Sequence, residues 1–286
     1  MNKGIVLAGG AGTRLRPLTK AVSKQLLPIY DKPMIFYPIS VLMLSQIREI
    51  LIITDPISLP IYKRLLGSGE QLGMNFNYIE QMQPRGLPEA FILGERFINN
   101  QRHALVLGDN FFHGQGLSEI LLEAKKSGDN FIFVRPSNNP KDFGVCQFND
   151  SGNFVSIVEK PVTPPSNLVA TGLYFFDGSA PEIAKTLQPS RRGELEISDM
   201  INIYAARDKI KLKQLGRGCA WLDTGTFEGL HNAATYVRTL QDQEGYMIGC
   251  LEEIAYRNQW ISKEKFIEVA TEYCGNYRDY LERLIQ

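Results

Sequence analysis

The sequence predicts an α/β protein whose mixed, mostly parallel sheet is flanked by helices. Short apolar runs rich in β-branched residues, at residues 5–8, 49–54 and 103–107, are typical of buried parallel strands. Segments with helical periodicity, such as residues 34–45 and 117–124, alternate with these runs. Strand and helix alternating along a chain indicate a Rossmann-like architecture.

Length and charge narrow the class of protein. The 286 residues suffice for one large α/β domain or two small ones, and they include 31 Lys and Arg against 31 Asp and Glu. This balance does not indicate a nonspecific nucleic-acid or membrane binder. The N-terminal residues do not show the basic and apolar regions expected of a leader, and no apolar run approaches the ~18 residues of a membrane-spanning helix. We therefore expect a soluble, cytoplasmic protein that binds neither nucleic acid nor membrane.

The cysteines and histidines do not indicate a disulfide framework or a zinc site. The four cysteines have no CxxC spacing and the three histidines are scattered, so we expect reduced, structural thiols. These residues are Cys146, Cys219, Cys250, Cys274, His103, His113 and His231.

The first strand runs into a glycine-rich, basic turn. Three glycines within four positions let backbone N–H groups converge on an anion, and Thr13 and Arg14 add donors suited to phosphate oxygens. A Walker A loop requires Lys-Ser or Lys-Thr where Thr13-Arg14 stands, and a dinucleotide fingerprint requires Gly or Ala where Leu15 stands. The turn is therefore either a different phosphate cradle or an ordinary strand-to-helix connection. The glycines are Gly9, Gly10 and Gly12.

The alternation continues after this loop. Residues 23–33 are bounded by prolines and are predicted to be irregular; Lys24 is either solvated or folded back beside the glycine-rich loop. After the strand at residues 49–54 a short helix is expected, and residues 76–80 form the next strand. The apolar face predicted for that helix comprises Ile57, Ile61 and Leu65.

A polar loop, residues 81–89, follows that strand. Ligands of open parallel sheets lie outside the carboxyl ends of the strands, so this loop should share a rim with the glycine-rich loop. Gln81 either reads a base edge, since its amide offers donor and acceptor side by side, or is a surface glutamine. The following helix presents Leu87, Ala90, Phe91, Gly94, Phe97 and Ile98 on one face.

The run at residues 103–107 ends in Gly108-Asp109, which places a carboxylate on the same rim. Mg²⁺ prefers hard oxygen ligands and usually takes only one or two from protein, so Asp109 is a candidate metal ligand. The alternative is an aspartate that caps the following turn.

Residues after Arg135 change in character. Residues 143–148, 154–160 and 168–176 are strands with short connections, which predicts an antiparallel insertion or extension of the sheet. One strand ends in Glu159-Lys160, either a surface ion pair or a carboxylate for sugar hydroxyls beside an ammonium for a phosphate.

The last third contains helices and one more strand that ends in an aspartate at the same rim of the sheet. Helices are expected at residues 180–187, after residue 197, at 227–240 and within 249–284. A short strand ends at Asp223, which could hold one Mg²⁺ together with Asp109. We expect one α/β domain over residues 1–240, with halves of about 1–135 and 136–240, and a C-terminal helical subdomain over 241–286.

Six motifs in this order resemble the sugar nucleotidyltransferases, most closely the bacterial thymidylyltransferases among them. The resemblance covers nearly the whole chain and implies a nucleotidyltransferase fold, similar to glycosyltransferase A. The motifs are Leu7-Ala8-Gly9-Gly10-Ala11-Gly12-Thr13-Arg14-Leu15, Ser23-Lys24-Gln25-Leu26-Leu27-Pro28, Leu107-Gly108-Asp109-Asn110, Val158-Glu159-Lys160-Pro161, Arg192-Gly193-Glu194-Leu195-Glu196 and Trp221-Leu222-Asp223-Thr224-Gly225.

The resemblance implies a single displacement assisted by Mg²⁺. A phosphate oxygen of glucose 1-phosphate attacks the α-phosphorus of dTTP in line, giving dTDP-glucose and pyrophosphate. This would be the first step toward dTDP-rhamnose or related deoxysugars. Homotetramers inhibited by a dTDP-sugar are typical of the relatives.

The resemblance also implies a role for particular residues. The residues that it implies for binding the nucleotide are Leu7, Gly9, Gly10, Gly12, Thr13, Arg14, Lys24, Gln25, Gln81, Pro84, Gly86 and Asp109. The residues that it implies for binding the sugar phosphate are Asn110, Gly144, Glu159, Lys160, Ala170, Tyr174, Arg192 and Trp221. The implied catalytic residues are Arg14, Lys24, Asp109, Lys160, Arg192 and Asp223, of which Asp109 and Asp223 would bind Mg²⁺.

The chain departs from the family pattern at the loop that would receive the base. The family usually has Pro-Asp-Gly-Leu-Ala-Gln-Ala where this chain has Pro-Arg-Gly-Leu-Pro-Glu-Ala at residues 84–90. Arg85 replaces the aspartate and Pro88 enters the first helical turn, where proline is tolerated. Ala170 stands where the family usually has Val. A uridylyl- or cytidylyltransferase acting on another sugar phosphate, and a non-catalytic sugar-nucleotide sensor, are the alternatives.

Overall fold

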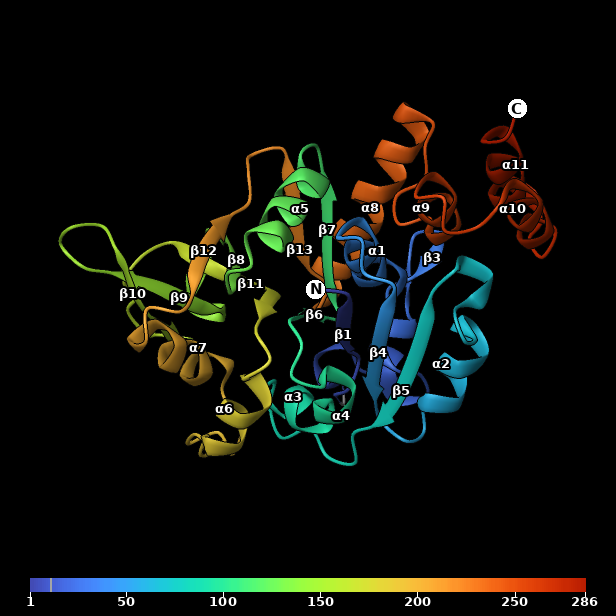
Figure 1. Cartoon of the computed structure of the whole chain (residues 1–286). Coiled ribbons are helices and arrows are strands. Elements are labelled where there is room, and N and C mark those ends of the chain that lie inside the picture. Colours follow the sequence, from blue (N-terminus) through green and yellow to red (C-terminus); the bar gives the residue numbers. More distant parts are fainter. Residues whose placement is uncertain (11) are drawn as a thin grey trace.

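The central sheet is parallel on one side, as shown in the computed structural model (Figure 1), which describes residues 1–10 and 12–286. Strand β1 (Lys3–Leu7) lies between β4 (Glu49–Thr54) and β6 (His103–Leu107) and is parallel to both. Strand β5 (Asn75–Glu80) extends the parallel part beyond β4. The carboxyl ends of these strands therefore meet at one edge, as the alternating sequence predicted.

An antiparallel part completes the sheet on the far side of β6. Strand β11 (Leu168–Phe176) runs antiparallel to β6. The sheet order is β10-β9-β11-β6-β1-β4-β5, with β8 joined to β11 and β12 joined to β8. The predicted mixed fold with an antiparallel extension is confirmed. The remaining strands are β8 (Phe131–Pro136), β9 (Gly144–Phe148), β10 (Phe154–Glu159) and β12 (Lys211–Gln214).

A separate two-stranded ribbon was not predicted as a pair. Strand β7 (Asn110–Gly114) lies antiparallel to β13 (Cys219–Asp223), although more than a hundred residues separate them in sequence. A small hairpin, β2 (Pro28–Ile29) with β3 (Lys32–Pro33), interrupts the segment predicted to be irregular. The ribbon matters because it brings the residues after β6 beside those at the end of β13.

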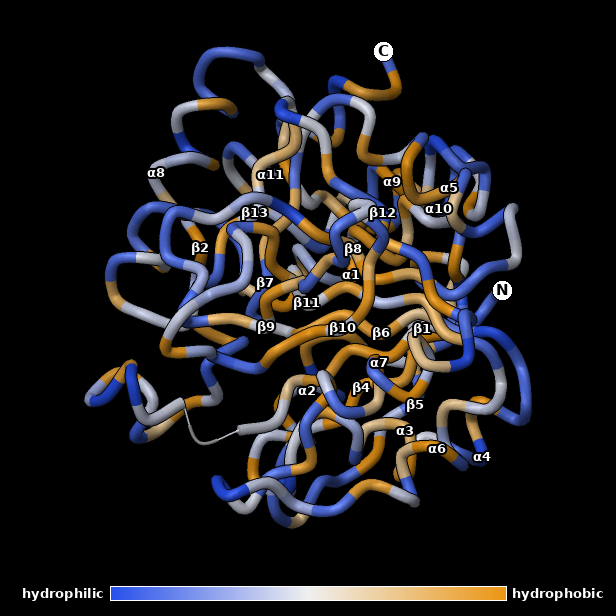
Figure 2. Tube along the Cα trace, turned by 90° about the vertical axis from the view of Figure 1, so that its left-hand side faces the viewer, coloured by the Kyte–Doolittle hydropathy of each residue, from blue (hydrophilic) through white to orange (hydrophobic). Residues whose placement is uncertain are grey.

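Alternate side chains of the parallel strands supply apolar layers on the two faces of the sheet. Val6 and Ile52 belong to one apolar cluster, and Ile5 and Leu51 belong to the other. Figure 2 shows the apolar segments gathered along the central strands and the polar ones at the periphery. Helices α1 (Phe36–Leu44) and α5 (Leu117–Ser127) cover the first face; α3 (Glu89–Leu93), α4 (Glu95–Ile98), α6 (Ala180–Thr186) and α7 (Ile197–Ala206) cover the second.

The predicted apolar face of helix α2 (Leu59–Leu66) is wrong. Ile57 precedes the helix and is 85% exposed, and Leu65 is 36% exposed. The helix instead buries Leu59, Tyr62 and Leu66. The helix begins two residues later than the periodicity suggested, because residues 55–58 form a turn closed by the Asp55 carboxylate, which accepts from the Ser58 amide at 2.9 Å.

The last three helices of the chain add side chains to the apolar cluster on the first face of the sheet. Helix α8 (Phe227–Glu244) continues past residue 240, so the predicted boundary at 240/241 falls inside it. Helices α9 (Leu251–Arg257), α10 (Lys263–Ala270) and α11 (Gly275–Arg283) contribute Leu251, Phe266 and Leu281 to the same apolar cluster as Val6. In residues 1–10 and 12–286, no helix combines the length and apolar character needed to cross a membrane.

All four cysteines are free thiols, as expected. Cys146, Cys219 and Cys250 are buried and Cys274 is exposed. Burial raises the pKa of the Cys146 thiol to about 12, which keeps it protonated and unreactive.

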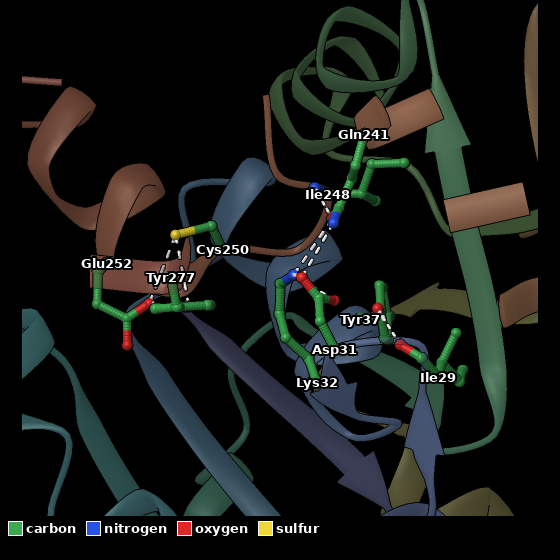
Figure 3. A network of polar contacts seen from close by, with 9 residues as sticks. All are labelled: Ile29, Asp31, Lys32, Tyr37, Gln241, Ile248, Cys250, Glu252 and Tyr277. Atoms are coloured by element: carbon green, nitrogen blue, oxygen red, sulfur yellow. Dashed lines mark hydrogen bonds and ion pairs between the residues drawn. The ribbon is translucent and has the colours of Figure 1, made fainter. Parts of the chain in front are cut away.

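Buried polar contacts fasten the C-terminal helices to the hairpin β2–β3 (Figure 3). Lys32, only 2% exposed, donates to Asp31 at 2.7 Å and to Gln241 Oε1 at 3.2 Å.

Nearby, Glu252 is 3% exposed and accepts from the hydroxyls of Tyr273 at 2.5 Å and Tyr277 at 2.7 Å. A buried carboxylate with two donors ties α9 to the segment around α11.

We expect Glu252→Ala to lower the free energy of unfolding by about 3 kcal/mol, because two buried tyrosine hydroxyls lose a charged acceptor. Urea unfolding followed by circular dichroism measures this change. The matched control is Glu272→Ala, at an exposed glutamate one residue before Tyr273, with an expected change within about 0.5 kcal/mol. Equal stability of the two variants would contradict a fastening role for Glu252.

Candidate active site

The glycine-rich loop leaves β1 at the parallel edge of the sheet. Gly10 and Gly12 have φ of 109° and 55°, which favours glycine, and a short 3-10 turn (Thr13–Leu15) follows. A Cβ on Gly9 would lie 2.2 Å from Gln81 Oε1, so a larger residue there would displace the Gln81 side chain. Thr13 and Arg14 are exposed, so their donors are accessible to a ligand. Ala11, within the predicted loop, lies outside the described residues.

A first cavity of about 310 Å³ opens beside this loop. Of the residues predicted for the nucleotide, Gly10, Lys24, Gln81 and Pro84 line it. Leu7 and Gln25 do not line this cavity and are buried, with 8% and 4% of their surface exposed. Residues that the sequence did not single out also line the cavity, among them Thr19, Lys20, Ser23, Asp55, Ser58 and Met82.

A second cavity of about 340 Å³ lies at the junction of β6, the ribbon and the antiparallel part of the sheet. Seven of the eight residues predicted for the sugar phosphate line it, together with three predicted catalytic residues. The former are Asn110, Gly144, Glu159, Lys160, Ala170, Tyr174 and Trp221, and the latter are Arg14, Asp109 and Asp223. Leu107, Asp142, Phe143, Thr171 and Gly172 also line it and had no sequence signal of their own.

An ion pair joins the two cavities. Lys24, which lines the first, donates its ammonium to Asp109 Oδ2, and Asp109 lines the second. Lys24 is 8% exposed, so the prediction of a residue folded back beside the loop describes it better than that of a solvated lysine. A charge held between two adjacent cavities is placed to act on groups bound in both.

The ribbon brings the two predicted metal ligands together. Asp223 pairs with Asn110 in the β7–β13 register, and Thr224 donates to the Asp109 carbonyl through N at 3.1 Å and Oγ1 at 2.7 Å. Burial, followed by the negative charge of Asp109, raises the pKa of the Asp223 carboxyl above its ordinary value. Two neighbouring carboxylates whose charges repel fit a hard divalent cation.

Asp109 and Asp223 offer hard carboxylate oxygens, the kind of ligand that Mg²⁺ accepts. The described part of the chain holds no group of three or more His, Cys, Asp or Glu side chains placed for one ion. Mg²⁺ uses one or two carboxylates and completes its shell with water and phosphate oxygens.

Asn110 links Asp109 to the aromatic wall of the second cavity. Its Nδ2 donates to Asp109 Oδ1 at 3.1 Å, and its Oδ1 accepts from Trp221 Nε1 at 2.6 Å. Trp221 in turn packs against Phe143 with ring centroids 5.1 Å apart. This chain of contacts fixes both Asn110 and the Asp109 carboxylate.

Charged residues gather at the end of β10. Lys160 has a φ of 41°, unusual outside glycine, and its N–H donates to the Phe143 carbonyl at 3.0 Å. Burial raises the pKa of the Glu159 carboxyl above its ordinary value. Arg192 does not line the second cavity; it donates to Glu196 at 2.6 Å and to Glu159 at 3.4 Å.

The loop predicted to receive the base is held in place by two contacts. Gly86 forms an isolated parallel bridge with Leu195, whose N–H donates to the Arg85 carbonyl at 2.7 Å. A Cβ on Gly86 would lie 2.1 Å from the Leu195 carbonyl oxygen. The Arg192–Glu196 segment therefore contacts the loop at residues 81–89 and, through Glu159, the second cavity.

Comparison with known proteins identifies the family. The model of the nucleotidyl transferase family matches residues 3–239. The chain belongs to this nucleotidyl transferase family. A glucose-1-phosphate thymidylyltransferase from Neisseria meningitidis is 52% identical over 286 residues, with 99% of both chains covered. One of the same name from Mycobacterium tuberculosis is 45% identical, also with 99% of both chains covered.

Solved structures agree with the assignment to the nucleotidyl transferases. A UDP-glucose pyrophosphorylase complexed with UDP-glucose is 27% identical, with a TM-score of 0.73 over 84% of this chain and 99% of that one. A Bacillus anthracis structure described as a candidate glucose-1-phosphate thymidylyltransferase is 34% identical, with a TM-score of 0.75 over 82% and 95%. The predicted family is confirmed, and the roles of individual residues stay predictions.

Proposed function

We propose that this chain transfers a thymidylyl group from dTTP to glucose 1-phosphate and releases pyrophosphate. The observation that carries the proposal is the pair of cavities joined by Lys24 and Asp109. Gly10 of the glycine-rich loop lines one cavity, and the other contains most of the residues predicted for the sugar phosphate. Two polyanionic substrates brought to a shared ion pair are what a nucleotidyl transfer requires.

The chemistry is a single in-line displacement. A phosphate oxygen of glucose 1-phosphate forms a bond to the α-phosphorus of dTTP, and the bond from that phosphorus to the pyrophosphate oxygen breaks. Lys24 and Arg14 offset the negative charge that shifts onto the leaving pyrophosphate. Asn110 and Trp221 hold one wall of the sugar cavity.

We also propose that Asp109 and Asp223 hold Mg²⁺. When bound, the ion would neutralise phosphate charge and orient the phosphate oxygens. Lys24 pairs with Asp109 and would turn toward the triphosphate when substrates and Mg²⁺ bind.

The sugar phosphate would be held by Lys160 and Arg192. Arg192 is pre-paired with Glu196 and Glu159, so anion binding replaces part of an existing contact. Such pairing keeps the guanidinium ordered before the substrate arrives.

The test of the proposed function is product formation by the purified chain. With dTTP, glucose 1-phosphate and Mg²⁺, chromatography should show dTDP-glucose and pyrophosphate in equal amounts. Omission of any one component should abolish both products. Binding of both substrates without turnover would support the alternative of a non-catalytic sensor.

Isotope exchange tests the single displacement. Labelled pyrophosphate should not enter dTTP when glucose 1-phosphate and dTDP-glucose are absent, because no nucleotidyl-enzyme forms. Rapid exchange under those conditions would indicate a covalent intermediate.

We expect Gly9→Ala to lower kcat/KM for dTTP by about 10-fold or more, because its Cβ would displace Gln81 and the loop by a fraction of an ångström. Steady-state kinetics measures this effect. Gly216→Ala is the matched control, since a Cβ there meets nothing within 4 Å. Equal kinetics for both variants would remove the Gly9–Gln81 contact from nucleotide binding.

We further propose that the enzyme is a cytoplasmic homo-oligomer, as in the tetramers of the family it resembles, with feedback by a dTDP-sugar. Light scattering of the full chain gives the oligomeric state.

A further inference from the structure

A carboxylate that the sequence did not single out contacts the residue predicted to read the base. Glu89 begins helix α3, and its side chain is 14% exposed. Its Oε2 accepts from Gln81 Nε2 at 2.7 Å and from the Arg85 backbone N–H at 3.0 Å. Its Oε1 lies 3.9 Å from Arg85 Nε, in a side chain that is 69% exposed. All of these partners are donors or cations, as an ionised carboxylate requires.

This contact determines which end of the Gln81 amide faces the nucleotide cavity. A carboxylate only accepts hydrogen bonds, so the amide must turn its NH₂ end toward Glu89. The other end, Oε1, then lies against Gly9 in the glycine-rich loop, as the 2.2 Å from a Gly9 Cβ indicates. Gln81 is 4% exposed and its backbone N–H donates to the Thr54 carbonyl at 2.7 Å, so the residue has little freedom.

A fixed acceptor discriminates between pyrimidines. Thymine and uracil carry a donor, N3–H, where cytosine carries an acceptor. Gln81 Oε1 can bind the first two through N3–H, whereas cytosine would place two lone pairs against each other. A freely turning amide would instead accommodate either kind of base.

We infer that Glu89 is a positioning residue that fixes the Gln81 amide and thereby selects bases with N3–H over cytosine. The inference rests on the proposed function, in which Gln81 contacts the base. It assigns no contact between Glu89 and substrate. Glu89 acts through Gln81 and through the order it gives to the loop at residues 81–89.

The test compares kcat/KM for dTTP, dUTP and dCTP with glucose 1-phosphate in the wild type and in Glu89→Gln. The wild type should prefer dUTP to dCTP by about 100-fold or more. In Glu89→Gln the new amide can donate as well as accept, so Gln81 can turn and the dUTP/dCTP ratio should fall by about 10-fold or more. The dTTP/dUTP ratio should stay within 2-fold, because both bases carry N3–H.

Two further variants separate positioning from folding. Glu89→Asp keeps an acceptor-only group and should retain the dUTP/dCTP ratio even where overall activity falls. Glu95→Gln makes the same change on the next helix, where the glutamate pairs with Lys185 at 2.5 Å, and should leave both ratios unchanged.

An unchanged dUTP/dCTP ratio in Glu89→Gln would overturn the inference, and this includes an equal loss with all three nucleotides. Equal changes of the ratio in the Gln and Asp variants would overturn it as well. A wild type that does not distinguish dUTP from dCTP would also overturn it while leaving the proposed function intact. Absence of wild-type turnover with dTTP would instead overturn the proposed function.

Discussion

An Asp109→Asn enzyme should turn over at least about 100-fold more slowly than the wild type. The asparagine keeps the size of the side chain but removes the charge that pairs with Lys24 and, in our proposal, with Mg²⁺. Loss of one group that stabilises the transition state costs roughly 100- to 1000-fold. Pyrophosphate release at saturating dTTP, glucose 1-phosphate and Mg²⁺ measures the change.

A control separates chemistry from folding in this variant. Asp109 also contacts Thr224 through its backbone carbonyl, and the substitution leaves those two hydrogen bonds in place. The protein should therefore stay folded at the assay temperature, although loss of the buried Lys24–Asp109 pair lowers its melting temperature. Near-native turnover at saturating Mg²⁺ would remove the Asp109 carboxylate from the mechanism.

Lys160→Ala should lower kcat/KM for glucose 1-phosphate by about 100-fold and leave the KM for dTTP within about 3-fold. The ammonium lines the second cavity and not the first, so its loss affects only the sugar phosphate. Initial rates measured while each substrate is varied distinguish the two effects.

The nearby Lys141 provides the control for this second change. It is an exposed lysine in the short 3-10 turn Pro140–Asp142, so Lys141→Ala should keep wild-type kinetics. Lys160→Arg should recover part of the loss, since it restores the charge. A large rise in the KM for dTTP in Lys160→Ala would contradict the division of substrates between the cavities.

The parallel strands and their rim residues could be predicted because each signal is local. The run ending at Leu7 and the run ending at Leu107 are neighbouring parallel strands, so Gly9 and Asp109 share an edge. Apolar runs followed by glycine or aspartate carry that information in a few consecutive residues. The fold class and the first half of the site follow from these patterns.

The ribbon β7–β13 was not predictable in the same way. Residues 110–114 mix aromatic, amide and histidine side chains, and their partner strand comes more than a hundred residues later. Nothing local signals such a long-range pairing. The adjacency of Asp109 and Asp223 rests on it, which is why the second aspartate was only a candidate.

Side-chain partners were the least predictable feature. Arg192 pairs with Glu196 and Glu159, and Glu89 accepts a hydrogen bond from Gln81. Both arrangements depend on rotamers set by the tertiary structure. The apolar face of α2 was misassigned because Ile57 lies in a turn at the mouth of the first cavity. An apolar residue at a cavity mouth has the same sequence signal as one in a core.

The most direct test of the proposed activity is pyrophosphate release from a matrix of nucleoside triphosphates and sugar 1-phosphates. We predict the highest kcat/KM for dTTP with glucose 1-phosphate. dUTP should be poorer by roughly 10- to 200-fold, as expected for one methyl group in an apolar pocket. A higher kcat/KM for another nucleotide or another sugar phosphate, or pyrophosphate release that does not require a sugar phosphate, would contradict the proposal.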